Sequence, residues 1–335
     1  TRRKQFGRIE DKSYMASIFT SRGCPFKCTF CSSHTIHGRK MRYRSNENVT
    51  EEMMILYHKY GVTEFLPEDD LFTVHKPRIL SLLSSIRKLN IPNMSMQFPN
   101  ALSVNTLDEE LLDALFDTGM DIATLAIESG SDYVQKNIIT KRCNLDRAKR
   151  LVSYIKEKGH YVRCYFIVGF PRETKDMMHQ TMNFASTLNA DWSAMFTAVP
   201  LVGSEMYEEF YNDGVITDEK KIWREFYMER NFDTNNIKAQ WLNSFVQFNN
   251  YMINFFNNPN LKDGKFDRAL TLFDEVVSRH DKHVVGHYCK LVCYDGLGDS
   301  KNYDKTLFKI KDLIANDESS SIIYNKYKSE FKLLN

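Results

Sequence analysis

Three cysteines, Cys24, Cys28 and Cys31, lie within eight residues and have the spacing C-x3-C-x2-C. Thiolates are soft ligands, and three of them on one loop can converge on a single metal centre. A structural zinc site needs a fourth ligand, which His34 or His37 would supply. An iron-sulfur cluster held by three cysteines instead leaves one iron open to an exogenous ligand.

The residues around the three cysteines favour the cluster over zinc. Structural zinc sites usually pair two short knuckles, and no second Cys/His pair at that spacing lies near residues 24–37. A catalytic zinc with three cysteine ligands is the remaining metal alternative. The cysteine total of seven is odd, so the triplet is a poor disulfide framework and indicates a reducing compartment. We therefore expect a cytoplasmic protein.

The elements that position these cysteines alternate between strand and helix. Six short apolar or β-branched runs predict strands near residues 16–20, 62–66, 94–98, 122–127, 161–168 and 192–198. Apolar residues at helical spacing between these runs predict helices. Such alternation is typical of an α/β fold with a mostly parallel sheet and right-handed crossovers. Ligands of such sheets gather at the carboxyl ends of the strands.

Two of the predicted helices have end signals. One covers residues 145–158, with Asn144 as its N-cap and Gly159 as its stop. The other ends at Gly61 and begins near residue 46, with Asn46 or Asn48 as its N-cap. Both helices should lay one apolar face on the sheet.

The strand signal fades after about residue 226, and residues 241–335 predict helices separated by short polar turns. Helices over about 264–276 and 283–294 form a pair of thirty-odd residues, near the period of tetratricopeptide (TPR) repeats, and 303–314 could begin another. A plain helical cap fits equally well. We divide the chain into a basic segment (1–14), a core (15–230) and an all-helical domain (231–335).

Composition restricts the class of protein. Of 335 residues, 42% are hydrophobic and 26% charged, which is typical of a globular chain and excludes a disordered or collagen-like one. The net charge is +2, so a nucleic-acid partner is not expected. Residues 1–44 nevertheless carry eleven Lys or Arg against two acids, which indicates either a solvated face or an anion-binding mouth. No apolar run is long enough to span a membrane.

Four stretches, taken together, resemble the radical S-adenosylmethionine (SAM) superfamily over about residues 10–230. The first is the cysteine motif, with the aromatic Phe30 before its last cysteine. The others follow in the family's order: FLPEDDLFT at 65–73, AIESGS at 126–131 and FIVGFPRET at 166–174. They look most like the branch whose members often carry an N-terminal cobalamin-binding domain.

The resemblance implies a partial (βα)6 radical SAM barrel followed by the helical, TPR-like domain. It implies that Cys24, Cys28 and Cys31 bind a 4Fe-4S cluster, that SAM chelates the open iron, and that Phe30 touches the adenine region. An electron from the reduced cluster would cleave SAM to a 5'-deoxyadenosyl radical, which abstracts hydrogen from an unidentified substrate. The electron donor would be a flavodoxin or ferredoxin. Any cobalamin module would lie before Thr1, outside this sequence.

Further cofactor contacts follow from the same resemblance. It places Asp69 at the SAM amine, and Glu128 with Ser129 at the ribose and methionine portion. Read from the residues alone, the alternative for the first is a solvated acidic turn or a helix cap, and the alternative for the pair is a helix-capping turn. Arg163 could clamp a carboxylate from the fifth strand or lie on the surface.

The motif at the end of the fifth strand departs from the family pattern. Gly169 would allow the backbone to approach adenine closely, and Pro171 would fix the exit of the chain. The family usually has glycine after the proline, whereas this chain has Arg172. The substitution puts the geometry of this turn in doubt.

Two other functions compete with the radical enzyme. A methylthiotransferase-like tRNA modifier shares the cysteine spacing, but its family ends in a small β-rich domain. A metal-binding scaffold would use the helical region to bind a peptide. The four remaining cysteines, Cys143, Cys164, Cys289 and Cys293, raise the question of a second cluster, and we expect the helical pair 289/293 to be buried core thiols.

Overall fold

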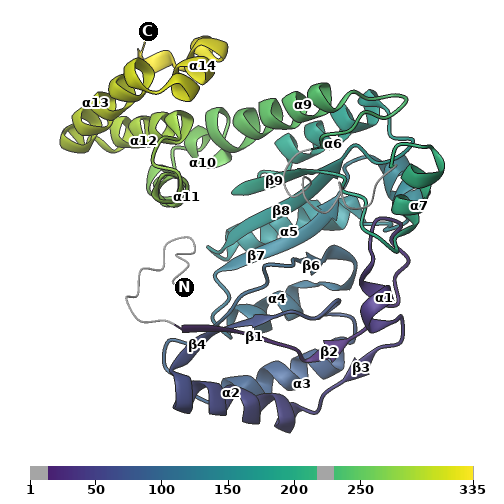
Figure 1. The fold of residues 1–335 in the computed structure, drawn as a ribbon. Helices are drawn as coiled ribbons and strands as arrows, with labels where there is room; N and C mark the ends of the chain where they lie inside the picture. The colour runs from purple at the N-terminus through teal and green to yellow at the C-terminus, as the bar shows by residue number, and fades with distance from the viewer. Residues whose placement is uncertain (1–13, 217–229, 335) are drawn as a thin grey trace. The chain divides into compact units, whose positions relative to one another are not determined.

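Strands and helices alternate along the first two thirds of the chain in the order that the sequence predicts (Figure 1). The computed structural model describes residues 14–216 and 230–334. Each of the six expected strands is present within a few residues of its predicted limits: β1 (Tyr14–Ile18), β4 (Val62–Pro67), β5 (Ser95–Met96), β7 (Ile122–Glu128), β8 (Tyr161–Val168) and β9 (Trp192–Thr197). Three two-residue strands, too short for a periodic signal, were not predicted: β2 (Ser21–Arg22), β3 (Arg42–Tyr43) and β6 (Leu102–Ser103).

The longer strands form two parallel sheets in the described part of the chain. One has the order β1-β4-β5 and the other β6-β7-β8-β9, while β2 and β3 form a separate antiparallel ribbon. Ile18 pairs with Pro67 at the end of the first sheet, and Val168 pairs with Thr197 at the end of the second. The carboxyl ends of neighbouring strands therefore lie together. The α/β class is confirmed, and a single partial barrel stays a prediction.

Amphipathic helices cover these sheets because each presents one apolar stripe. Helix α3 (Lys76–Arg87) buries Ile79, Leu82, Leu83 and Ile86. Strand β8 alternates between half-buried and buried side chains along its whole length, as expected for a strand with one face packed on helices. The other helices of this part are α1 (Ser33–His37), α2 (Asn46–Tyr60), α4 (Glu109–Phe116), α5 (Leu145–Glu157), α6 (Lys175–Thr187) and α7 (Glu205–Asn212), with η1 (Val104–Thr106) and the π-helix η2 (Val134–Ile138).

The predicted N-cap is right for one helix and wrong for the other. Asn144 caps α5, because its side chain accepts a hydrogen bond from the Arg147 backbone N–H at 2.8 Å. Helix α2 ends at Gly61 as predicted, but its N-cap is Ser45, which accepts from the Asn48 N–H at 3.2 Å, and not Asn46 or Asn48. Serine and asparagine are both good N-caps, so composition alone does not choose among neighbours.

The described residues divide into two compact units between Gln247 and Phe248, within helix α9 (Ala239–Tyr251). The limits 15–230 and 231–335 stay a prediction about the domains. The C-terminal unit is helical: η3 (Met252–Phe256), α10 (Pro259–Lys262), α11 (Phe266–Arg279), α12 (Val284–Leu297), α13 (Ser300–Asn316), α14 (Glu318–Lys326), η4 (Lys328–Glu330) and η5 (Lys332–Leu334). A TPR-like arrangement stays a prediction. Among residues 14–216 and 230–334, no helix is both long and apolar enough to cross a membrane.

The Asn144 cap gives a direct test of the fold. Asn144→Ala should lower the free energy of unfolding by about 1 kcal/mol, because an N-terminal N–H of α5 loses its acceptor. Urea denaturation followed by circular dichroism measures the loss. Asn144→Ser keeps a side-chain acceptor, so its free energy of unfolding should remain near that of the parent. An equal loss of stability in both variants would contradict a capping role.

Candidate functional site

The cysteine loop connects strand β2 to helix α1. Cys24, Cys28 and Cys31 are half-buried free thiols. The Cys24 N–H donates to the Gly38 carbonyl at 3.2 Å, and the Cys31 N–H donates to the Cys28 carbonyl at the same distance. The pKa of Cys28 is raised to about 11, mainly by burial and also by the other two thiols, while Lys141 opposes the shift. The three sulfur groups therefore lie within electrostatic reach of one another.

The three cysteine thiols fit an iron-sulfur cluster better than the alternative zinc site. His37 hydrogen-bonds through Nδ1 to Asp70 at 2.8 Å, and its ring lies edge-on to Phe19. Within residues 14–216 and 230–334, no three His, Cys, Asp or Glu side chains are gathered around one ion position. A mononuclear zinc needs all its ligands within about 2.3 Å of one point, whereas a cluster binds each thiolate to a different iron. Three free thiols on one loop match the second arrangement.

Two acidic residues after strand β4, Asp69 and Asp70, fix the start of the cysteine loop. Asp69 is buried, and its carboxylate accepts from the Thr20 N–H at 2.7 Å, the Thr20 hydroxyl at 2.6 Å and the Ser21 hydroxyl at 2.5 Å. Asp70 accepts from the Gly23 N–H at 2.8 Å. These two carboxylates are thus neither a solvated turn nor a helix cap. The contact of Asp69 with the SAM amine stays a prediction, because three internal donors already bind this carboxylate.

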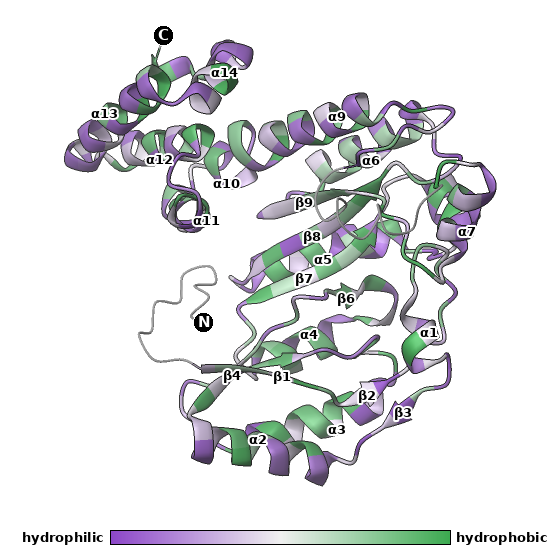
Figure 2. Ribbon diagram, viewed as in Figure 1, coloured by the Kyte–Doolittle hydropathy of each residue, from purple (hydrophilic) through white to green (hydrophobic). Residues whose placement is uncertain are grey.

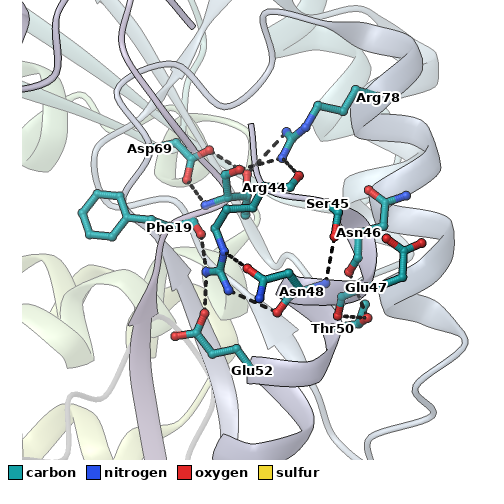
Figure 3. Close-up of polar contacts among 11 residues, drawn as sticks. Phe19, Arg44, Ser45, Asn46, Glu47, Asn48, Thr50, Glu52, Asp69 and Arg78 are labelled. Carbon is teal, nitrogen blue, oxygen red and sulfur yellow. Dashed lines mark hydrogen bonds and ion pairs between the residues drawn. The ribbon is translucent and has the colours of Figure 1, made fainter. Parts of the chain in front are cut away.

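Two arginines hold the same turn from its other side (Figure 3). The Arg44 guanidinium donates to the Phe19 carbonyl at 2.7 Å and pairs with Glu52 at 2.5 Å. Arg78 donates to the Thr20 carbonyl at 2.7 Å. Burial lowers the pKa of Arg78, and Asp69 partly opposes that shift. The peptide groups between β1 and β2 are therefore held by Asp69 and both arginines. Sequence spacing could not predict the hydrogen-bond partners of these three residues.

Strand β7 ends in a strained, charged residue. Glu128 has a φ of +70°, beside an irregularity in the pairing of β7 with β8. Its carboxylate pairs with Lys141 at 2.7 Å, and both side chains are 9% exposed. Burial lowers the pKa of Lys141, but Glu128 raises it more, so the net pKa is above the ordinary value. A positive φ in a non-glycine residue is costly and is found mainly at functional sites.

Lys141 reaches the cysteines because the segment after η2 is bound to the cysteine loop. The Thr29 N–H and hydroxyl donate to the carbonyls of Ile139 and Ile138 at 3.1 and 2.8 Å. The Thr140 hydroxyl donates to the Lys27 carbonyl at 2.6 Å. Sequence reasoning missed Lys141, because no motif or spacing marks a lysine thirteen residues after Glu128.

Ser129 and Arg163 make contacts of other kinds. Ser129 directly follows Glu128; it is fully buried, and its hydroxyl is 2.9 Å from that of Thr181 in α6. Arg163 is half-buried in β8, five residues before Val168 and so about 17 Å from the carboxyl end of the strand. The predicted contacts of both residues with SAM stay predictions.

Phe30 lies beside Phe170, which follows Gly169 at the carboxyl end of β8. The Phe30 and Phe170 ring centroids are 5.9 Å apart. The Gly169 N–H donates to Glu173 at 2.6 Å, and its carbonyl accepts from Arg230. Burial raises the pKa of Glu173 to about 7. Both polar groups of Gly169 are therefore bound internally, so any contact with adenine would be by close approach and not by these hydrogen bonds.

The turn after Pro171 adopts the left-handed backbone expected of the family glycine. Arg172 has a φ of +64°, and its guanidinium forms two hydrogen bonds with Glu209 at 3.1 and 3.0 Å. The substitution thus keeps the turn at some conformational cost.

The other four cysteines, Cys143, Cys164, Cys289 and Cys293, are buried, and burial raises the pKa of each thiol. Cys289 and Cys293 are core thiols, as expected.

The chain was compared with known proteins. The profile of the Radical SAM superfamily matches residues 18–185. Cytidylyl-2-hydroxyethylphosphonate methyltransferase of Streptomyces wedmorensis is 32% identical over 223 residues, which are 65% of this chain and 41% of that protein. The anaerobic magnesium-protoporphyrin IX monomethyl ester cyclase of Rubrivivax gelatinosus is 25% identical over 203 residues, which are 60% of this chain and 36% of the cyclase.

A solved structure supports the fold. The radical SAM methyltransferase TsrM from Kitasatospora setae, with cobalamin and a 4Fe-4S cluster bound, gives a TM-score of 0.54 at 19% identity. The match covers 62% of this chain and 41% of TsrM. The chain spans about two fifths of the length of each of these relatives.

The buried ion pair predicts a large effect on stability. Lys141→Met should lower the free energy of unfolding by about 3 kcal/mol, because Glu128 is left as an unpaired buried charge. Urea denaturation of the metal-free protein measures this loss. The double variant Glu128→Gln/Lys141→Met removes both charges and should recover most of it, whereas additive losses would contradict direct pairing.

Asp69→Ala tests whether this carboxylate mainly anchors the loop. The Thr20 N–H would lose a buried acceptor, at a cost of about 1–3 kcal/mol, and we expect the variant to retain less iron after reconstitution. Glu68→Ala is the matched control, since Glu68 contacts Ser17 and Asn100 instead. Full iron content and stability with weakened SAM binding would contradict the anchoring role and support the SAM contact.

Proposed function

Because this chain belongs to the radical SAM superfamily, we propose that Cys24, Cys28 and Cys31 hold a 4Fe-4S cluster and that the protein cleaves SAM reductively. The observation that carries the proposal is the set of three free, half-buried thiols on one loop that separate parts of the core hold in place. When bound, the cluster supplies the electron for cleavage of SAM to methionine and a 5'-deoxyadenosyl radical, which abstracts hydrogen from substrate.

The residues around the loop have positioning and electrostatic roles. Asp70 fixes the backbone at Gly23, and Thr29 and Thr140 fix it on the two sides of Cys28, so the ligand spacing is set before a cofactor arrives. Lys141 places a buried positive charge near Cys28, which favours the thiolate form that binds iron. Phe30 and Phe170 present an apolar wall beside Gly169, suited to a flat ring and to the exclusion of water.

We extend the proposal to a methyltransferase type that works with cobalamin bound outside this chain. It is supported by the Streptomyces relative, whose name is that of a methyltransferase, and by TsrM, which was solved with cobalamin. The likeness to TsrM concerns the fold, so the use of cobalamin by this protein belongs to the proposal. The substrate and the one-electron donor are likewise proposals about the whole protein.

The methylthiotransferase reading has less support. Its family carries a β-rich C-terminal domain, whereas the described residues 259–334 contain only helices, turns and short connections. If the protein were a scaffold, it would bind metal without cleaving SAM. The chain's membership of an enzyme superfamily favours catalysis.

Cys28→Ala tests the proposed function. With two thiols left, the variant should lose nearly all iron and sulfide and should produce no 5'-deoxyadenosine from SAM and dithionite. Its far-ultraviolet circular dichroism should match that of the parent. Cys143→Ala, which removes a buried thiol outside the loop, should keep the iron. A Cys28→Ala protein that still cleaves SAM would overturn the proposal.

A further inference from the structure

Five cations lie on or beside the cysteine loop in sequence. They are Arg22, Lys27, Arg39, Lys40 and Arg42, which we name the basic loop face, and they are exposed or half-exposed. None of the five forms an ion pair within residues 14–216 and 230–334. Other cations of the core do have such partners: Arg44 with Glu52, Lys76 with Asp108 and Arg172 with Glu209. Within the described part of the chain, the face is therefore not paired with any carboxylate.

Two of these cations are placed against each other. In the β2–β3 ribbon Arg22 pairs directly with Arg42, and both are exposed. Like charges opposite each other destabilise an antiparallel pair. Figure 2 shows this ribbon in purple, the hydrophilic end of the scale. Two adjacent positive side chains that lower the stability of the ribbon are typical of a surface that binds a negatively charged partner.

The face is built onto the cysteine loop itself. A side chain at Gly23 would collide with the Lys40 carbonyl, whose oxygen would be only 2.4 Å from the added carbon, so the two segments are in close backbone contact. Arg39 donates to the Phe26 carbonyl at 2.5 Å, and Arg42 donates to the His37 carbonyl at 2.8 Å. These hydrogen bonds hold the guanidinium groups in place but leave their charge unneutralised.

A hollow of about 370 Å³ gives part of this face a concave shape. Phe19, Arg22, Arg42 and Tyr43 are among the residues that line it. The Arg22 guanidinium lies 5.5 Å from the centre of the Phe19 ring. A carboxylate side chain of a partner could enter this hollow and meet both arginines. Arg44 and Glu52 also line the hollow, and their charges are paired with each other.

We propose that the basic loop face docks the acidic surface of a one-electron donor protein. The inference rests on the proposed function, in which the donor loses one electron and the cluster gains it. Because electron transfer slows steeply with distance, a donor must bind close to the cysteines. Arg22 is two residues before Cys24, and Lys27 is adjacent to Cys28. Complementary charge would speed association and orient the donor at this loop.

The test uses the reconstituted protein and a flavodoxin as the acidic probe. Arg22→Glu/Arg42→Glu should weaken flavodoxin binding, measured by calorimetry at low salt on both metal-free and reconstituted protein, by about tenfold or more. The rate of cluster reduction by flavodoxin should fall similarly, and rising salt should narrow the difference. Reduction by dithionite, which needs no docking, should be unchanged.

Lys59→Glu/Lys88→Glu is the matched control, because it reverses two exposed cations at the ends of α2 and α3. If the Arg22→Glu/Arg42→Glu variant binds flavodoxin and is reduced by it as well as the parent is, the docking proposal is overturned. Equal loss in both double variants would also overturn it, since net charge alone would then explain binding. A single-stranded oligonucleotide serves as a second anionic probe. If the Arg22→Glu/Arg42→Glu variant loses binding to the oligonucleotide but not to flavodoxin, the docking proposal is also overturned. Failure of dithionite to reduce the parent would instead count against the proposed function.

Discussion

The carboxylates that follow strand β4 are the constraint on which the site depends. Parallel pairing brings the ends of β1 and β4 together, so Asp69 and Asp70 lie beside the start of the cysteine loop. Asp69 binds the backbone at Thr20, and Asp70 binds it at Gly23. A buried carboxylate is costly unless it is fully hydrogen-bonded. Asp69, Asp70 and the cysteine loop therefore stabilise one another, and neither geometry is independent of the other.

A second set of buried charges lies on the other side of the loop. Glu128 ends β7 with a positive φ, and Lys141 is brought to it by a segment that hydrogen-bonds to the loop at Thr29. The pair places opposite charges where thiolates would bind iron. Both sheets thus contribute to one small region: the first holds the beginning of the loop, and the second holds its centre. Outside it, the five cations of the basic loop face form no ion pair within the part of the chain that the structure describes.

The sequence was sufficient for features that depend on local pattern. Periodicity located the six main strands and helix α5, and cysteine spacing located the candidate metal ligands. The missed features depend on contacts between distant residues. The β2–β3 ribbon is too short for a periodic signal, and Lys141 and Arg230 acquire their roles only when the chain folds. Asp69 was correctly placed at a strand end, but its three donors come from Thr20 and Ser21, 48 or 49 residues earlier in the chain, and spacing cannot show that.

The central claim is that this loop holds a cluster with an iron that SAM can reach. Low-temperature electron paramagnetic resonance of the reduced, reconstituted protein, with iron and sulfide counts, tests it most directly. The account predicts about four irons and four sulfides for each chain and a cluster signal that SAM shifts. Bound zinc without sulfide, or a cluster signal that SAM leaves unchanged, would contradict it.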